Sequence, residues 1–216
     1  MKAAIIGLGS FGSNVAKTLY ERGHEVLAID KDKEKIDGAK DFTSHAVHTD
    51  SMDKKNLEAL GVSEMDVVIV SLGHELEASV LTVLYLRELG VKRVIAKAQN
   101  EDHGKILAAI GATEVVYPEK EMAIRTALRL ASPNVLDSLC LISGVSIQEI
   151  APLERFIGRS LKDLDLRNRY GIQVMAVREL VPERTVYVPQ ADFVIKDSDI
   201  LIVMGDEKSL EKLCAD

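Results

Sequence analysis

Residues 3–12 read AAIIGLGSFG, and this stretch decides the fold. Ala3 to Ile6 form an all-apolar run, which is typical of a buried parallel strand, and Gly7 ends it. With Gly9 and Gly12, Gly7 completes a GxGxxG pattern that precedes apolar residues at helical spacing. Such a loop permits a tight turn, lets a diphosphate approach the backbone and lets the helix pack closely on the strand. The start of that helix also offers free N–H groups and a positive dipole end to phosphate.

Asp30 adds a second element to this pattern, because it follows another apolar run, Val26 to Ile29. A carboxylate at this place in a nucleotide-binding fold accepts hydrogen bonds from both ribose hydroxyls and repels a 2′-phosphate, which disfavours NADP. The sequence therefore predicts an adenine nucleotide site; the alternative is a glycine turn that holds no ligand. The residues expected at the phosphates and ribose are Gly7, Gly9, Ser10, Phe11, Gly12, Asp30 and Lys31.

Further candidates follow the later strands, whose carboxyl ends point into the same crevice. Asp50 is suited to accept a hydrogen bond from an adenine amino group, and Lys97 is suited to approach phosphate. Each has a structural alternative, since Asp50 would also serve as a helix N-cap and Lys97 as a solvated side chain. The complete set is Asp50, Ser51, Ser71, Leu72, Gly73, Lys97 and Asn100.

The first part of the chain alternates short apolar runs with helical patterns. That alternation predicts a Rossmann-like, doubly wound α/β domain with a parallel sheet and helices on both faces. Glycines are expected to end several of its helices. The expected strands are Ala3 to Ile6, Val26 to Ile29, Ala46-Val47, Val67 to Val70, Val94 to Ala96 and Val115-Val116, and helices are expected at 53–60, 75–89 and 101–110.

The pattern changes at Pro118, the first of five prolines. The sequence predicts a nucleotide-binding domain over 1–118, a connecting helix and linker over 119–137 with a break at Pro133, and a small α+β domain over 138–216. Strands of the last domain are expected at Leu139 to Ile142, Val145 to Ile150, Gln173 to Arg178, Thr185 to Val188 and Ile200 to Met204, with helices near 160–166 and 206–213.

Composition excludes several classes of protein. A net charge of −7 argues against a general nucleic-acid partner. Cys140 and Cys214 form no disulfide framework, and the apolar runs are too short for a signal peptide or a membrane span, so a cytoplasmic protein is expected. His45 and His48 face opposite sides of a predicted strand, which argues against zinc.

Two predicted helices, 75–89 and 119–131, carry apolar residues around more of their circumference than one buried face requires. Contact with another subunit explains this distribution, and burial within the chain is the alternative. The sequence therefore predicts an oligomer.

These features together resemble a known family. The segments IIGLGSFGSNVAKTL, TDSMD, VSLG, VIAKAQN and GATEVVYPEKEMA occur in the order found in the RCK (KTN) domain of potassium channel and transporter regulators. FIGRSLKDLDLRNRYGIQVMAV and IKDSDILIVMGDEKSLEKL resemble the C-terminal domain of the same proteins. A single unit of this kind is the layout of the KtrA/TrkA-type regulatory subunit of potassium uptake systems.

The resemblance implies a regulator that is not an enzyme. Family members form homo-dimers that assemble into an octameric ring on the cytoplasmic face of a KtrB/TrkH-like potassium transporter, and exchange of ATP for ADP, or NADH for NAD, gates the pore. Glu119 matches an acidic residue that in some members binds a cation between subunits, and the region from Arg167 to Val174 matches one that in some members binds cyclic di-AMP.

One departure from the family concerns Ser10, because ATP-responsive members often carry arginine there. A serine hydroxyl cannot replace the bidentate, charged contact of a guanidinium with a terminal phosphate, which favours ADP or NAD(H). The alternative function is an NAD-dependent oxidoreductase of small substrates. Such an enzyme needs a proton-transfer group near the nicotinamide, and no histidine follows His103.

Overall fold

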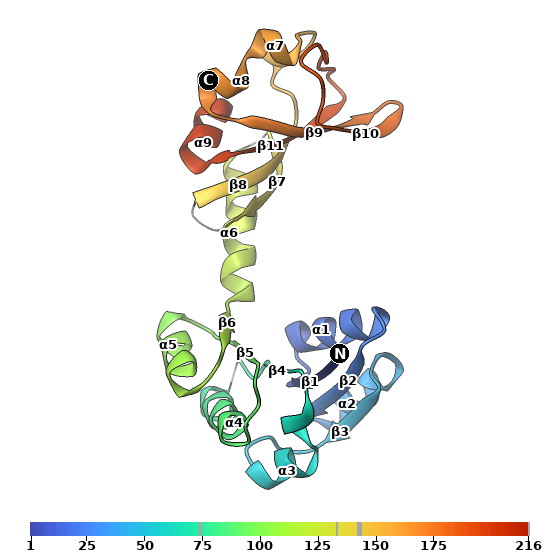
Figure 1. Cartoon of the computed structure of the whole chain (residues 1–216), viewed down its shortest axis with the longest axis vertical. Coiled ribbons are helices and arrows are strands. Elements are labelled where there is room, and N and C mark those ends of the chain that lie inside the picture. Colours follow the sequence, from blue (N-terminus) through green and yellow to red (C-terminus); the bar gives the residue numbers. More distant parts are fainter. Residues whose placement is uncertain (74, 133, 142–143, 216) are drawn as a thin grey trace. The chain divides into compact units, whose positions relative to one another are not determined.

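The chain divides into two units, Met1–Lys120 and Glu121–Asp216 (Figure 1). The structure is a computed structural model that describes residues 1–73, 75–132, 134–141 and 144–215. Pro133 and Ile142, at which the sequence predicts a helix break and a strand end, lie outside these ranges. Among the described residues, no helix combines the length and apolar character that crossing a membrane requires.

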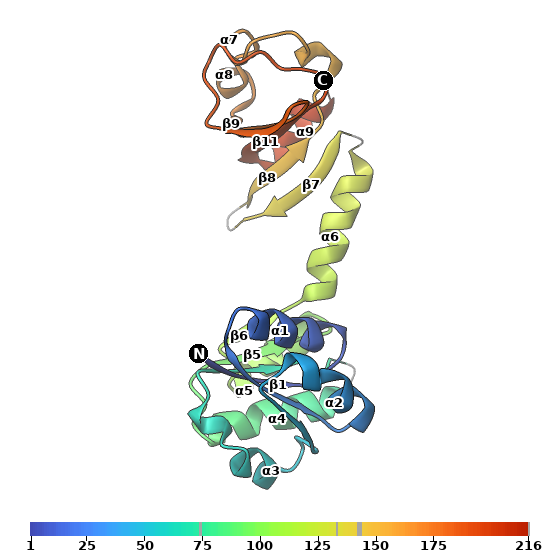
Figure 2. The same ribbon diagram turned by 90° about the vertical axis from the view of Figure 1, so that its right-hand side faces the viewer.

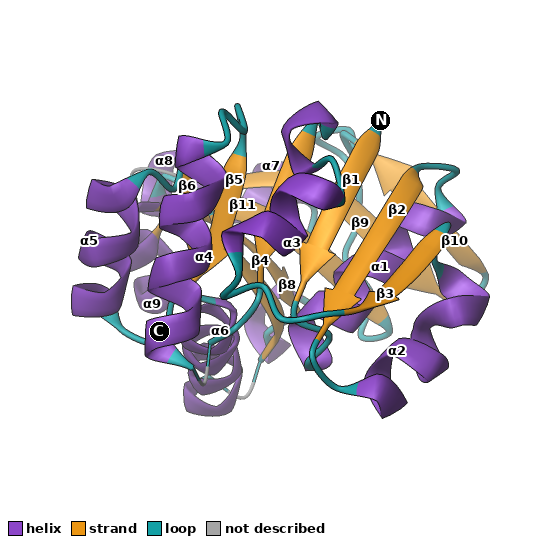
Figure 3. Ribbon diagram, turned by 90° about the horizontal axis from the view of Figure 1, so that it is seen from below, coloured by secondary structure: helices purple, strands orange, loops and turns teal. Residues whose placement is uncertain are grey.

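The first unit contains a six-stranded parallel sheet in the order β3-β2-β1-β4-β5-β6 (Figure 3). The strand order reverses next to β1, and the reversal creates the crevice at which doubly wound folds bind ligands. This arrangement confirms the predicted Rossmann-like class. The strands are β1 (Lys2–Ile6), β2 (Glu25–Asp30), β3 (His45–His48), β4 (Val67–Val70), β5 (Val94–Lys97) and β6 (Glu114–Val116).

Helices cover both faces of this sheet, and successive strand residues alternate between two cores. Ala3 and Ile5 of β1 belong to the core beneath α1 and α2, whereas Ala4 and Ile6 belong to the core beneath α3, α4 and α5. The helices are α1 (Ser10–Glu21), α2 (Lys33–Ala39), α3 (Lys54–Ala59), α4 (Leu76–Glu88) and α5 (Glu101–Ile110), with short 3-10 turns η1 (Lys40–Phe42) and η2 (Val62–Glu64).

Helix α2 has no counterpart among the helices predicted from the sequence. It buries only Ile36 and Ala39, so its apolar residues give little helical periodicity. Its start is defined by Asp32, whose side chain accepts a hydrogen bond from the backbone N–H of Glu34. Capping and packing against β2 and β3 therefore stabilise a helix that its apolar pattern does not reveal.

The second unit contains a five-stranded antiparallel sheet in the order β10-β9-β11-β8-β7, and α9 packs beside β11 (Figure 2). Helix α6 (Pro118–Ala131) spans the boundary between the units. The strands are β7 (Val135–Cys140), β8 (Val145–Ile150), β9 (Gln173–Leu180), β10 (Glu183–Tyr187) and β11 (Asp199–Asp206), and the remaining helices are η4 (Glu154–Phe156), α7 (Leu161–Leu164), α8 (Leu166–Tyr170) and α9 (Glu207–Ala215).

Strand β7 differs from the prediction, because it begins at Val135, inside the stretch 119–137 expected to be helix and linker. Asp137 interrupts the apolar pattern at this point. In the structure its Oδ1 accepts a hydrogen bond of 2.7 Å from Nε of Arg125 in α6, and the guanidinium lowers the pKa of Asp137. Because its charge is paired with Arg125, the Asp137 carboxylate is tolerated within β7, although the sequence pattern at this position indicates a loop.

Candidate nucleotide site

Two glycines of the loop between β1 and α1, Gly7 and Gly12, pack closely against neighbouring backbone. Gly7 has a φ of +94°, and a Cβ there would lie 2.7 Å from the carbonyl oxygen of Ser71. A Cβ on Gly12 would lie 2.0 Å from the carbonyl oxygen of Gly7. Gly9, by contrast, faces open space, and a Cβ there would have no atom within 4 Å. The loop is therefore closed toward the sheet and open at Gly9, where a phosphate would approach.

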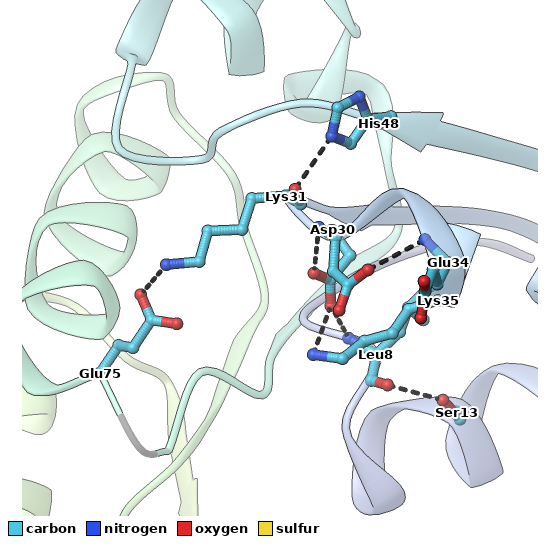
Figure 4. Close-up of polar contacts among 9 residues, drawn as sticks. Leu8, Ser13, Asp30, Lys31, Glu34, Lys35, His48 and Glu75 are labelled. Atoms are coloured by element: carbon cyan, nitrogen blue, oxygen red, sulfur yellow. Dashed lines mark hydrogen bonds and ion pairs between the residues drawn. The ribbon is translucent and has the colours of Figure 1, made fainter. Parts of the chain in front are cut away.

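Asp30 lies at the carboxyl end of β2, directly beside this loop (Figure 4). Its side chain is buried, and Oδ2 accepts a hydrogen bond of 2.6 Å from the backbone N–H of Leu8. Oδ1 accepts one of 2.8 Å from the backbone N–H of Asp32, and Nζ of Lys35 lies 3.7 Å from Oδ2. These contacts fix the carboxylate at the base of the crevice and join it to the glycine loop.

A pocket at the carboxyl ends of the first four strands brings part of the predicted site together. It encloses about 10 Å³, which is room for about one water. The predicted residues that line it are Gly7, Asp30, Lys31, Asp50, Ser51 and Leu72, and its walls also include Ile6, Ile29, Thr49, Glu75 and Ala78.

Glu75 and Ala78 of this lining were not predicted from the sequence. Nζ of Lys31 donates a 2.5 Å hydrogen bond to Oε2 of Glu75, and this contact raises the pKa of Lys31 (Figure 4). The pair joins the loop after β2 to the start of α4 across the pocket. No local pattern marks Glu75, because its partner lies far away in the sequence and only the fold brings the two together.

Asp50 and Asn100 have different local roles. Asp50 does not cap α3, since Asp53 is the N-cap; its Oδ1 instead accepts a 2.9 Å hydrogen bond from the backbone N–H of Met52. This turn leaves Asp50 at the pocket wall. Asn100 is the N-cap of α5 and accepts a hydrogen bond from the backbone of His103, so its side chain is committed to the helix.

The remaining predicted residues lie outside the pocket lining. Ser10 is exposed at the start of α1, whereas the side chain of Phe11 packs against the core beneath that helix. Only the backbone of Phe11 is thus available to a phosphate. Ser71 is buried after β4, and Gly73 follows it at a point where a Cβ would lie 3.2 Å from Cε of Lys97.

Lys97 forms an ion pair with Glu119, which links the end of β5 to the first turn of α6. The side chain of Lys97 is 11% exposed, so it is not the solvated lysine of the alternative interpretation. Within the described part of the chain, no three acidic, histidine or cysteine side chains gather closely enough to hold a metal ion.

His103 is buried beside α4 with both ring nitrogens engaged. Nδ1 accepts a hydrogen bond of 3.3 Å from the backbone N–H of Gln99, and Nε2 lies 2.8 Å from Oγ of Ser79. Ser79 donates its own proton to the carbonyl of Leu76. Nε2 therefore carries the ring proton and donates it, so the imidazole is neutral. Burial lowers the pKa of His103.

We expect this histidine to make the fold less stable in mild acid. Its pKa in the folded protein lies below the unfolded value of 6.5, so the unfolded chain binds a proton first as the pH falls. The stabilisation is complete above pH 6.5 and is lost as the pH falls below it. Urea unfolding of the wild type and His103→Gln between about pH 7.5 and 5.5 measures this, and the variant should show the smaller loss. Equal losses of stability in the wild type and the variant would contradict the assignment of His103 as a buried, neutral imidazole.

Comparison with known proteins gives matches over most of the chain. Residues 3–118 match the TrkA-N domain and residues 146–216 match the TrkA-C domain. The chain is 43% identical to Ktr system potassium uptake protein C of Bacillus subtilis (strain 168), over 97% of this chain and 94% of that protein. Its identity to Ktr system potassium uptake protein A of the same organism is 35%, over 97% and 93% of the two chains.

Solved structures also share the fold of this chain. The RCK domain of GsuK superimposes with a TM-score of 0.68 at 20% identity, over 99% of this chain and 47% of that one. The GsuK channel bound to NAD superimposes with a TM-score of 0.67 at 20% identity, over 97% and 38%. Because both domains match in order and the similarity to the Ktr proteins runs almost end to end, the chain belongs to the KtrA/TrkA-type family of RCK-domain potassium uptake proteins.

Proposed function

We propose that this protein is a nucleotide-binding regulatory subunit that gates a KtrB/TrkH-like potassium transporter or channel in response to adenine nucleotides. The observation that carries the proposal is a single crevice that joins the glycine loop, Asp30 and the Asp50–Ser51 pair, in a chain whose relatives of similar length are potassium uptake proteins. The protein would act at the inner face of the membrane through that partner.

The chemistry of the crevice favours ADP or NAD(H) over ATP. Backbone N–H groups at the start of α1 and the open face of Gly9 suit a diphosphate, and Asp30 suits the ribose hydroxyls. A third phosphate would be stabilised by a cationic side chain at position 10, and Ser10 supplies only a neutral hydroxyl. The GsuK channel, which has the same fold, is known with NAD bound.

Isothermal titration with ATP, ADP, NAD and NADH tests the nucleotide part of the proposal. We expect binding of at least one diphosphate ligand at sub-millimolar concentration. Control of a pore further requires unequal affinity for two states of the assembly, and a tenfold ratio corresponds to about 1.4 kcal/mol. If none of the four ligands bound, the proposed function would be wrong.

An NAD-dependent oxidoreductase is the competing function. It needs a general acid or base beside the nicotinamide. His103 is buried and forms hydrogen bonds with Gln99 and Ser79. It does not line the pocket, so it does not supply that acid or base. We therefore infer a regulator that is not an enzyme; steady turnover of a hydroxy acid with NAD would contradict this.

Assembly of copies into dimers and an octameric ring is the second part of the proposal, and two apolar surfaces support it. Helix α6 has no buried residue in the single chain and exposes Met122, Ile124 and Leu130. A groove of about 280 Å³ also lies on the α1 face of the sheet, over β4, β5 and β6. It is lined by Met1, Phe11, Val15, Leu19, Val67, Ile69, Arg93, Ile95, Glu114 and Val116. Association would bury both surfaces and could place Glu119 of two copies around a monovalent or divalent cation.

Replacing Leu130 with glutamate is expected to weaken assembly without unfolding the chain. Leu130 is 76% exposed, so a charge there costs little in the monomer but would be buried without a partner in an α6 interface. Light scattering should show a lower mass for Leu130→Glu and an unchanged mass for Lys92→Glu, a control at another exposed site. Equal masses for the wild type and Leu130→Glu would exclude α6 from the interface.

A pocket in the second unit supports a second ligand. It encloses about 240 Å³, and residues of the predicted Arg167 to Val174 region form part of its wall. Of the charged lining residues, Lys162 and Arg167 outnumber Asp165, and this net positive charge suits a phosphodiester. We therefore propose cyclic di-AMP as its ligand. The lining consists of Leu161, Lys162, Asp165, Leu166, Arg167, Ile172, Gln173, Val174, Pro189 and Ala191.

A further inference from the structure

Thr82 is a fully buried polar residue in the middle of α4. A threonine hydroxyl inside a helix commonly bonds to a carbonyl one turn earlier. Oγ1 of Thr82 instead donates to Oγ of Ser51 at 3.0 Å, with a longer contact of 3.4 Å to the carbonyl oxygen of Ser51. Ser51 lies in the loop after β3 and lines the nucleotide pocket, so a buried helix residue reaches directly to the pocket wall.

The loop that carries Ser51 is held by further hydrogen bonds. The backbone N–H of Met52 donates to Oδ1 of Asp50 at 2.9 Å, and Nδ2 of Asn56 donates to the carbonyl oxygen of Asp50 at 3.0 Å. With the contact from Thr82, these bonds anchor the neighbouring side chains of Asp50 and Ser51 on one wall of the pocket.

The direction of the Thr82 hydrogen bond determines what Ser51 offers to a ligand. Thr82 has one hydroxyl proton, and donating it to Oγ of Ser51, the shorter of the two contacts, leaves the Ser51 proton free to turn into the pocket. The wall then presents an acceptor, the Asp50 carboxylate, beside a donor, the Ser51 hydroxyl. Adenine carries a 6-amino donor next to ring-nitrogen acceptors, whereas a 6-oxopurine carries an acceptor oxygen at that position.

We propose that Thr82 is a positioning residue that directs the Ser51 hydroxyl toward the base and thereby sets the preference for adenine over 6-oxopurines. The inference rests on the proposed nucleotide site and adds its base specificity. A 6-oxopurine carries a protonated ring nitrogen, N1–H, where adenine offers an acceptor to the Ser51 hydroxyl, and it also places its 6-oxygen against Asp50. Both mismatches leave polar groups of the wall without partners, which costs binding free energy, and Thr82 and Ser51 control the first of them.

Isothermal titration of ADP and IDP, which differ at the 6-position of the base, tests the proposal. We expect the wild type to prefer ADP by about tenfold, the ratio that one hydrogen bond of about 1.4 kcal/mol gives. Thr82→Val keeps the shape of the side chain but removes the hydroxyl, and the preference should fall to about twofold. Thr82→Ser should restore it. Thr43→Val is the matched control, since Thr43 is also buried but donates to the carbonyl of Ala39 and does not line the pocket.

A double-mutant cycle separates this role from a general effect on packing. If Thr82 acts through Ser51, Thr82→Val should not change the ADP-to-IDP ratio further in a Ser51→Ala background. Ser51→Ala also covers the case in which Thr82→Val does not fold, because it should lower the ratio by itself. Equal affinity of the wild type for ADP and IDP, or an unchanged ratio in folded Thr82→Val or Ser51→Ala, would overturn the inference while leaving nucleotide binding intact. Failure of all adenine nucleotides to bind the wild type would instead contradict the proposed function.

Discussion

Replacing Gly12 with alanine is expected to destabilise the first unit by about 3 kcal/mol and to reduce nucleotide affinity at least about tenfold. The new Cβ would lie 2.0 Å from the carbonyl oxygen of Gly7 and 3.2 Å from Cβ of Ser71. The carbonyl oxygen of Gly7, which the new Cβ would meet first, belongs to the backbone, so no side-chain rotation relieves the clash. Helix α1 must move away from β1, and the N–H groups at its start, which we propose bind phosphate, move with it. Thermal unfolding and titration with ADP measure the two effects.

Gly9→Ala is the matched control for that experiment. A Cβ on Gly9 meets no atom within 4 Å, and its φ of −70° is open to any residue. Stability should therefore change by less than about 1 kcal/mol. The methyl group nevertheless points into the space that a diphosphate would occupy, so affinity should still fall. Destabilisation of similar size in both variants would show that the loop is not packed as described.

Replacing Asp30 with alanine is expected to weaken the preferred nucleotide about a hundredfold. The loss of hydrogen bonds between a carboxylate and two ribose hydroxyls corresponds to about 3 kcal/mol. The variant also leaves the buried N–H of Leu8 without its 2.6 Å acceptor, which costs a further 1–3 kcal/mol of stability, roughly. Titration and urea unfolding measure the two losses separately.

Asp32→Ala provides the comparison, because Asp32 caps α2 and does not line the pocket. It should cost about 1 kcal/mol of stability and leave affinity unchanged. If Asp30→Ala kept full affinity while remaining folded, the assignment of Asp30 to the ribose would be wrong. A loss of affinity in Asp32→Ala as large as that in Asp30→Ala would show that the effect is structural.

Local patterns predicted most of the first unit. The strands at Val67 and Val94 and the helix over 101–110 were found because apolar periodicity and capping residues are short-range features. Helix α2 was missed because it buries few apolar side chains, and the start of β7 was misplaced because Asp137 takes its partner, Arg125, from another element. Both errors occur where polar contacts compensate for a weak pattern.

The residues of the candidate site likewise fall into those that local spacing predicted and those that it did not reveal. Spacing alone pointed to Gly7, Gly12 and Asp30, since a glycine loop and the strand that follows it are defined within a short stretch of chain. It did not reveal Glu75, which pairs with Lys31 from 44 residues away. Nor did it reveal that Asn100 is committed to capping α5.

The sequence by itself determined the doubly wound sheet, the glycine loop and the carboxylate at the end of the next strand, because each is marked by a pattern within a short segment of the chain. Only the tertiary structure decided which side chains meet across the crevice. Thr82 contacts Ser51 from 31 residues away, and the same helix pairs Ser79 with His103. Such contacts depend on strand order and helix packing, and buried polar groups must find partners wherever the fold places them.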